Sequence, residues 1–144
     1  MEVRRYMKLS NIKAKLLIID DDADIRNAVR QTLESELESK IKITEANNVA
    51  SGLRALKKTK PDVVILDIVM PGESGIDFLH RLDNDKSLPK TKIIILTANA
   101  NIKNITTIEG IGENVYHFVY KPFINSELQA LVLNLIVPRA TEYS

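Results

Sequence analysis

The sequence predicts an α/β fold in which helices cover both faces of a parallel β-sheet. Five short runs rich in Ile, Val and Leu alternate with segments of helical periodicity, an order typical of βαβ units. Three of the runs are apolar at consecutive positions, which indicates strands that are buried on both faces. We expect one strand from each run, at Leu16–Asp20, Ile41–Ala46, Asp62–Asp67, Lys92–Thr97 and Val115–Tyr120.

The segment between the first two runs predicts a helix with one apolar face. Its apolar residues recur at helical spacing, and Asp24 stands where an N-cap residue would accept free backbone N–H groups. The apolar positions are Ile25, Ala28, Val29, Leu33 and Leu37. A second helix is expected at Val49–Lys58, where the last residues are lysines that complement the helix dipole.

Three further helices are expected in the second half of the chain. A turn-rich loop, Met70–Gly75, leads into a short helix, and the last helix has a predicted capping box formed by Ser126 and Gln129. The segment Asn101–Ile111 combines loosely spaced apolar residues with several β-branched ones, which favour helix poorly. We therefore expect that segment to be the most mobile helix.

Length and composition indicate one domain and exclude several classes of site. The 144 residues are enough for one core, and the net charge of +1 gives no overall field that would recruit nucleic acid or an anionic membrane. The absence of cysteine excludes disulfides, a thiol nucleophile and thiolate metal sites. No apolar stretch has the length of a signal-peptide core or a membrane span, so a cytoplasmic location is expected.

Polar side chains follow four of the predicted strands at their carboxyl ends, where an open parallel sheet binds its ligands. They are Asp20, Asp21 and Asp22 after the first strand, Asp67 after the third, Thr97 after the fourth and Lys121 after the fifth. Clustered carboxylates repel one another unless a cation is present, and an oxygen-rich set suits Mg²⁺. Because Lys121 and Thr97 could bind phosphoryl oxygens, the set indicates phosphoryl transfer.

Four stretches that carry these residues resemble the receiver domain of two-component response regulators. They occur in the family's order, as Leu16–Arg26, Pro61–Gly72, Ile95–Ala98 and Lys121–Phe123. The resemblance implies a flavodoxin-like, doubly wound sandwich with a five-stranded parallel sheet of order 2-1-3-4-5 and five helices. We expect a basic N-terminal lead at 1–14, the receiver domain at 15–138, and a tail or the start of a linker at 139–144.

The resemblance also implies a role for each site residue, with Asp67 as the phosphoacceptor. The implied Mg²⁺ ligands are Asp20, which would act largely through water, Asp21, Asp67 and the backbone carbonyl of Val69. The implied phosphoryl ligands are Thr97, the backbone of Ala98, and Lys121. Thr97 and Phe118 would form the switch, and since Phe118 lacks the hydroxyl that many members have, it would act by packing alone. The Lys121–Pro122 bond is expected to be cis.

The implied partner is a sensor histidine kinase or a phosphotransfer protein, whose phosphohistidine would supply the phosphoryl group. Such a domain is a phosphoacceptor that assists only its own phosphorylation and dephosphorylation, and is not an enzyme. No direct binding to nucleic acid or membrane is expected, while the downstream protein or output domain and homodimer formation stay open. The stretch Gly110–Asn114 departs from the family pattern, so the surface for the output partner does not carry over from relatives.

Two alternatives compete with the receiver interpretation. In a phosphatase resembling the haloacid dehalogenases, Asp20 would be the nucleophile and Asp22 the acid/base, but Asp67 would have no role and the further acidic pair after a late strand is missing. In a receiver-like module that only binds proteins, there would be no need for intact Asp21, Asp67, Thr97 and Lys121.

Overall fold

The structure is a computed structural model that describes residues 14–37, 40–99, 101–104, 110 and 113–136. It contains one five-stranded sheet in the order β2-β1-β3-β4-β5, and every neighbouring pair of strands is parallel. The strands are β1 (Ala14–Ile19), β2 (Ile41–Ala46), β3 (Val63–Leu66), β4 (Lys92–Thr97) and β5 (Val115–Tyr120). The predicted strand order and parallel sheet are confirmed.

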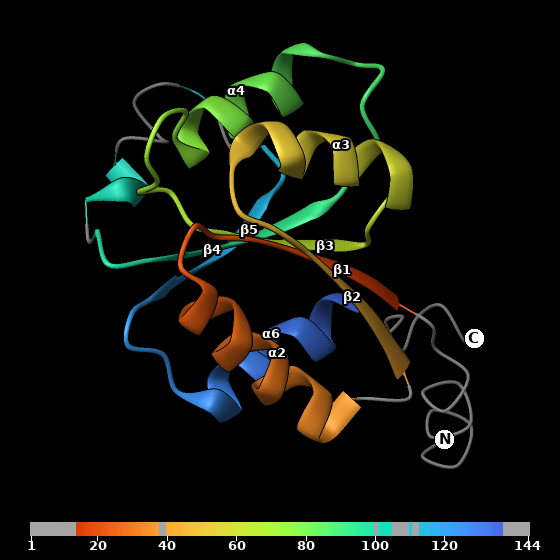
Figure 1. Cartoon of the computed structure of the whole chain (residues 1–144), viewed down its shortest axis with the longest axis vertical. Helices are drawn as coiled ribbons and strands as arrows, with labels where there is room; N and C mark the ends of the chain where they lie inside the picture. Colours follow the sequence, from red (N-terminus) through yellow and green to blue (C-terminus); the bar gives the residue numbers. More distant parts are fainter. Residues whose placement is uncertain (1–13, 38–39, 100, 105–109, 111–112, 137–144) are drawn as a thin grey trace.

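Helices lie on both faces of the sheet (Figure 1). Helices α3 (Val49–Thr59) and α4 (Gly75–Asn84) cover one face, and α2 (Ala23–Leu37) and α6 (Asn125–Ile136) cover the other. Residues 102–104 of the helix expected at Asn101–Ile111 are helical, and most of its remainder lies outside the described residues. The expected capacity of that helix for motion therefore stays a prediction.

Alternate residues of the central strands supply two separate hydrophobic cores. On β1, Leu17 and Ile19 pack into the core under α3 and α4, while Leu16 and Ile18 pack into the core under α2 and α6. All of β3 is at most 1% exposed. Burial on both faces explains the uninterrupted apolar runs. Polar side chains are therefore expected at the ends of these strands and not within them.

Two helix caps differ from the sequence prediction. The N-terminus of α2 is capped by Asp22, whose Oδ1 accepts the backbone N–H groups of Asp24 (2.9 Å) and Ile25 (3.4 Å), so the assignment of the cap to Asp24 was wrong. The helix begins at Ala23, two residues earlier than that assignment required, because the chain turns directly after the three aspartates.

The capping box expected from Ser126 and Gln129 is also absent. Helix α6 already begins at Asn125, before Ser126. The amide nitrogen of Gln129 instead donates to the backbone carbonyl of Thr32 (2.7 Å) and to the Ser35 hydroxyl (3.3 Å) on α2. Gln129 therefore joins the two helices of one layer, because a polar group between packed helices is stabilised by a partner across the contact.

Candidate functional site

The carboxyl ends of β1, β3, β4 and β5 bring four polar side chains to one edge of the sheet. Asp20 and Asp67 follow β1 and β3 directly, Thr97 ends β4, and Lys121 follows β5. The parallel register places Ile19 of β1 beside Leu66 of β3, so Asp20 and Asp67 are neighbours. Four of the residues expected to form one site therefore lie together.

The ammonium group of Lys121 lies between two buried carboxylates. Its Nζ atom is 3.1 Å from Asp20 Oδ2 and 3.4 Å from Asp67 Oδ2. Asp20 is 2% exposed and Asp67 is 5% exposed, so water contributes little to the screening of these charges. Two carboxylates share one ammonium, which leaves the site with an excess of negative charge.

Burial and the neighbouring charges both change the ionisation of Asp67 and Lys121. Burial, followed by repulsion from Asp20, raises the pKa of Asp67 to about 6, although Lys121 and the Val69 N–H group act in the opposite direction. Burial of Lys121 favours its neutral form, but the hydrogen bond to Asp20 and the charges of both aspartates outweigh this, so its pKa is raised. A further cation would stabilise the ionised form of Asp67.

A group of three carboxylates at this edge could hold a metal ion. Asp20, Asp21 and Asp67 each offer one oxygen, and these oxygens lie within 4.8 Å of one another. Asp20 is fixed by the Asp22 N–H group (2.9 Å) and by Lys121. Asp21 is exposed, and within the described ranges its carboxylate has no hydrogen-bond partner. Of the three carboxylates, that of Asp21 is therefore the least constrained by contacts in the described part of the chain.

The segment after Asp67 lies close against the start of α4. The backbone N–H of Val69 donates to Asp67 Oδ1 at 3.3 Å, and the N–H of Gly75 donates to the carbonyl of Ile68 at 2.9 Å. A Cβ atom on Gly75 would lie 2.6 Å from the backbone oxygen of Asp67. Only glycine fits at this contact, so Gly75 contributes to the position of Asp67.

The hydroxyl of Thr97 is inside the protein and is oriented by the loop that follows β4. Thr97 is 0% exposed, and its Oγ1 accepts the backbone N–H of Asn99 at 3.2 Å. The backbone carbonyl of Thr97 accepts the N–H of Lys121 at 2.9 Å, which ties the two residues together. Ala98, the next residue, is exposed, and the Lys121–Pro122 bond is cis, as expected.

Phe118 lies in the middle of β5, opposite Ile95 of β4. Its ring is partly buried and packs against the core under α3 and α4. The position is two residues along the sheet from Thr97, since Thr97 pairs with Tyr120. The predicted switch residues therefore lie on adjacent strands.

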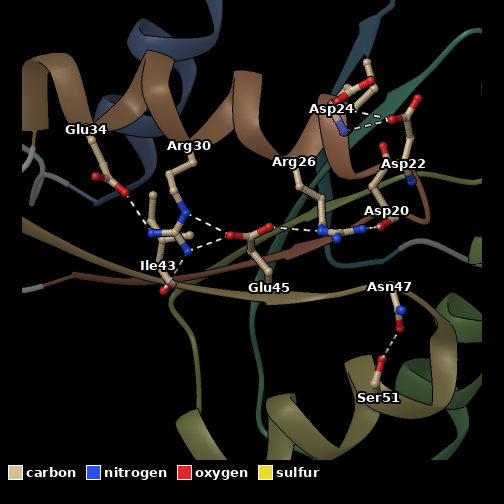
Figure 2. Close-up of polar contacts among 11 residues, drawn as sticks. Asp20, Asp22, Asp24, Arg26, Arg30, Glu34, Ile43, Glu45, Asn47 and Ser51 are labelled. Carbon is tan, nitrogen blue, oxygen red and sulfur yellow. Dashed lines mark hydrogen bonds and ion pairs between the residues drawn. The ribbon is translucent and has the colours of Figure 1, made fainter.

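Asp22 has a structural role that weakens the phosphatase alternative. Its carboxylate accepts backbone N–H groups at the start of α2 (Figure 2), and among the described residues it makes no contact with Asp67 or Lys121. The acid/base that this chemistry needs is therefore committed as the N-cap of α2.

One contact to the site was missed at the sequence level. Arg26 of α2 donates from Nη1 to the backbone carbonyl of Asp20 at 2.7 Å and from Nε to Glu45 at 2.9 Å (Figure 2). The signals that the sequence offers are the place of Arg26 one helical turn after the three aspartates and its inclusion in the family-like stretch Leu16–Arg26. The partner Glu45 comes from β2 and is visible only in the folded chain.

The comparison with protein families agrees with this geometry. The sequence profile of the response regulator receiver domain matches residues 16–133. This chain belongs to that family. Over 115 residues it is 34% identical to the phosphate regulon transcriptional regulatory protein PhoB of Pseudomonas aeruginosa, covering 80% of this chain and 48% of that protein.

Other relatives and solved structures support the family and the fold. The response regulator Rre1 of Synechocystis is 32% identical over 121 residues, covering 84% of this chain and 51% of Rre1. A receiver domain structure from Clostridium thermocellum has a TM-score of 0.70 and 30% identity, covering 85% of this chain and 94% of that one. The chain spans about half the length of the curated relatives it matches. In the ranges that the structure describes, no helix is both long and apolar enough to cross a membrane.

Proposed function

We propose that this receiver domain is a phosphorylation switch in which Asp67 accepts a phosphoryl group from the phosphohistidine of a sensor kinase or phosphotransfer protein. The observation that carries the proposal is the buried Asp67 carboxylate, 3.4 Å from the Lys121 ammonium and next to Asp20 and Asp21. A phosphoryl group is an anion, and this site combines a nucleophilic oxygen with a cation that is already in place.

The donor set fits Mg²⁺ as the cofactor. Asp20, Asp21, Asp67 and the backbone carbonyl of Val69 offer only oxygen atoms, which Mg²⁺ prefers. Burial and, after it, repulsion from Asp20 raise the pKa of Asp67, and a bound cation would act against both. When bound, Mg²⁺ would supply the positive charge that offsets these carboxylates and the oxygens of the incoming phosphoryl group.

In the transfer step, a carboxylate oxygen of Asp67 forms a bond to phosphorus while the N–P bond of phosphohistidine breaks. The electron pair of that bond stays on the imidazole nitrogen, which leaves with the donor protein. Lys121 binds one phosphoryl oxygen through its ammonium group, and Thr97 and the backbone N–H of Ala98 donate to others. The Thr97 oxygen accepts from Asn99, so its own hydrogen is free to be donated.

The switch follows from the same contacts. A hydrogen bond from Thr97 to the phosphoryl group would draw its side chain toward Asp67 and open space next to β5. Phe118 packs beside this region and would turn into that space, changing the surface offered to a protein partner. Because Phe118 has no hydroxyl, the free energy of this movement comes from packing alone.

The proposed biological setting is phosphorelay signalling in the cytoplasm. We assign the domain to 15–138, with the basic lead at 1–14 and the tail or linker at 139–144. The domain assists its own phosphorylation and dephosphorylation and does not turn over a separate substrate. Its output is a change in affinity for a protein partner or an attached domain, with no direct contact to nucleic acid or membrane, and homodimer formation is left open.

The proposal is tested by incubating the protein with acetyl phosphate and Mg²⁺ and measuring its intact mass. We expect a gain of one phosphoryl group that is lost in Asp67→Asn and in the presence of EDTA. An undiminished gain in Asp67→Asn would refute the assignment of the acceptor. Turnover of a general phosphatase substrate that Asp20→Asn abolishes and Asp67→Asn does not would favour the phosphatase alternative.

A further inference from the structure

A charged network runs from the acidic loop of the site along α2 to the edge strand β2 (Figure 2). Arg26 lies at the end nearest the site and pairs with Glu45 at 2.9 Å. Glu45 is bound in turn by Arg30 at 2.8 Å, and Arg30 pairs with Glu34 at 2.7 Å. The network thus contains two guanidinium groups and two carboxylates, so its net charge is zero.

The contact that links this network to the site is made to the backbone. Arg26 Nη1 donates to the carbonyl oxygen of Asp20 at 2.7 Å. That carbonyl belongs to the planar peptide unit between Asp20 and Asp21. The orientation of this unit therefore affects the direction in which the side chains of both residues point. Arg26 is itself constrained, because its side chain is 18% exposed and its Nε is bonded to Glu45.

The two aspartates depend on this peptide to different degrees. The Asp20 carboxylate is also fixed by Lys121 and by the Asp22 N–H group. The exposed Asp21 carboxylate lacks a hydrogen-bond partner in the described part of the chain, so its position relative to Asp67 is set mainly by its backbone. A group that fixes the backbone at this point therefore controls the geometry of the carboxylate cluster.

We propose that Arg26 is a positioning residue that fixes the Asp20–Asp21 peptide and so arranges these carboxylates to bind a divalent cation. The inference rests on the proposed function. It extends that function by assigning to Arg26, which Glu45 holds in place, a task in preparing the site. Loss of groups that orient metal ligands lowers metal affinity by roughly tenfold to a hundredfold.

Arg30 provides a matched control within the same network. Arg26→Gln and Arg30→Gln each remove one positive charge and one partner of Glu45, but of the two arginines only Arg26 has a described contact with Asp20. Arg26→Lys keeps the charge while losing the forked geometry that bonds two partners at once. The three variants thus separate positioning from charge and from general stability.

The test is a calorimetric titration of the full chain with MgCl₂, with thermal unfolding followed by circular dichroism to verify folding. We expect Arg26→Gln to raise the Mg²⁺ dissociation constant roughly tenfold or more. Arg26→Lys should also raise the dissociation constant, and Arg30→Gln should change it by less than about threefold. At saturating Mg²⁺, phosphorylation from acetyl phosphate should return to within about threefold of the wild-type rate in both Arg26 variants.

Equal dissociation constants for Arg26→Gln and Arg30→Gln would overturn the inference. So would tighter binding by Arg26→Gln, because that result would mean that Arg26 acts through its charge. If Arg26→Gln fails to fold, wild-type affinity in Arg26→Lys overturns the inference in the same way. If the wild-type chain neither binds Mg²⁺ nor gains a phosphoryl group, the proposed function itself fails, and that outcome is distinct from the others.

Discussion

Strand β3 is bounded by an aspartate at each end, and the two carboxylates have opposite surroundings. Asp62, at the amino end, is exposed, and its carboxylate accepts the backbone N–H of Lys15 at 2.8 Å. Asp67, at the carboxyl end, is 5% exposed and shares the Lys121 ammonium with Asp20. Identical side chains at the two ends of one strand therefore differ in solvation and in their polar contacts, and only Asp67 has the surroundings of a reactive group.

The largest difference between the two ends of β3 is expected when the lysine at each end is replaced by glutamine. Lys121→Gln removes the cation beside Asp67 and should slow phosphorylation by acetyl phosphate roughly 100- to 1000-fold, the usual cost of losing one charge-stabilising group. Lys15, whose Nζ donates to the Thr59 carbonyl at 3.1 Å, lies at the other end of the strand. Lys15→Gln should leave the rate within about twofold. The phosphorylation rates of the two variants are measured from time courses of intact mass at saturating Mg²⁺. Equal slowing in both would contradict the conclusion that only the Asp67 end of β3 is reactive.

The second prediction concerns stability and pH in the presence of EDTA. The pKa of Asp67 in the folded protein is about 6, against an ordinary value of 3.8. Between these values the folded protein binds more protons than the unfolded chain, so the raised pKa makes stability fall as pH rises through this window. Relative to Asp67→Asn, the wild-type free energy of unfolding should fall by about 1 to 3 kcal/mol between pH 4 and pH 7.

Asp62→Asn is the control for that measurement, because the amide oxygen can still accept the Lys15 N–H group. Its free energy of unfolding should stay within about 0.5 kcal/mol of the wild-type value at pH 7. Urea denaturation at several pH values gives both results. A wild-type curve parallel to that of Asp67→Asn would show that Asp67 titrates as an ordinary carboxyl group.

The third prediction tests the packing that supports Asp67. Gly75→Ala would place a Cβ atom 2.6 Å from the Asp67 backbone oxygen, and should cost about 1 to 2 kcal/mol and slow phosphorylation. Gly52→Ala would instead meet the Cδ1 atom at the end of the Ile19 side chain at 2.7 Å. This clash is with the far end of a side chain and not with the backbone, and alanine favours helix, so a change below about 1 kcal/mol and an unaltered rate are expected. Equal losses in the two variants would argue against a specific role for Gly75.

The fold could be predicted from the sequence because its strands are buried on both faces. Uninterrupted apolar runs such as Val63–Leu66 leave little freedom in assigning a central parallel strand. The predicted site residues also lie together, since parallel strands bring their carboxyl ends to one edge. Helix ends were predicted less well, because Asp22 and Asp24 both satisfy the pattern of an N-cap and only the direction of the turn after β1 selects between them.

The contacts that sequence analysis missed involve partners distant in the chain. Gln129 fits a capping pattern locally, but its amide nitrogen donates a hydrogen bond to the carbonyl of Thr32, 97 residues away. From the sequence, Arg26 is expected only to lie on the polar face of an amphipathic helix. Its ion pair with Glu45 depends on how α2 packs against β2. Such choices between local and distant partners are decided by tertiary packing, which a single sequence does not specify.

The hydrogen bonds between α2 and α6 have a consequence for how the domain unfolds. The Thr32 hydroxyl bonds to Asn125 at 3.2 Å and Gln129 bonds to the Thr32 carbonyl at 2.7 Å, so the first and last helices of the described fold are fastened side by side. These hydrogen bonds join helices that are far apart in the sequence. Neither helix can unfold without breaking contacts with the other, which favours a single cooperative unfolding transition over the local unfolding of either helix.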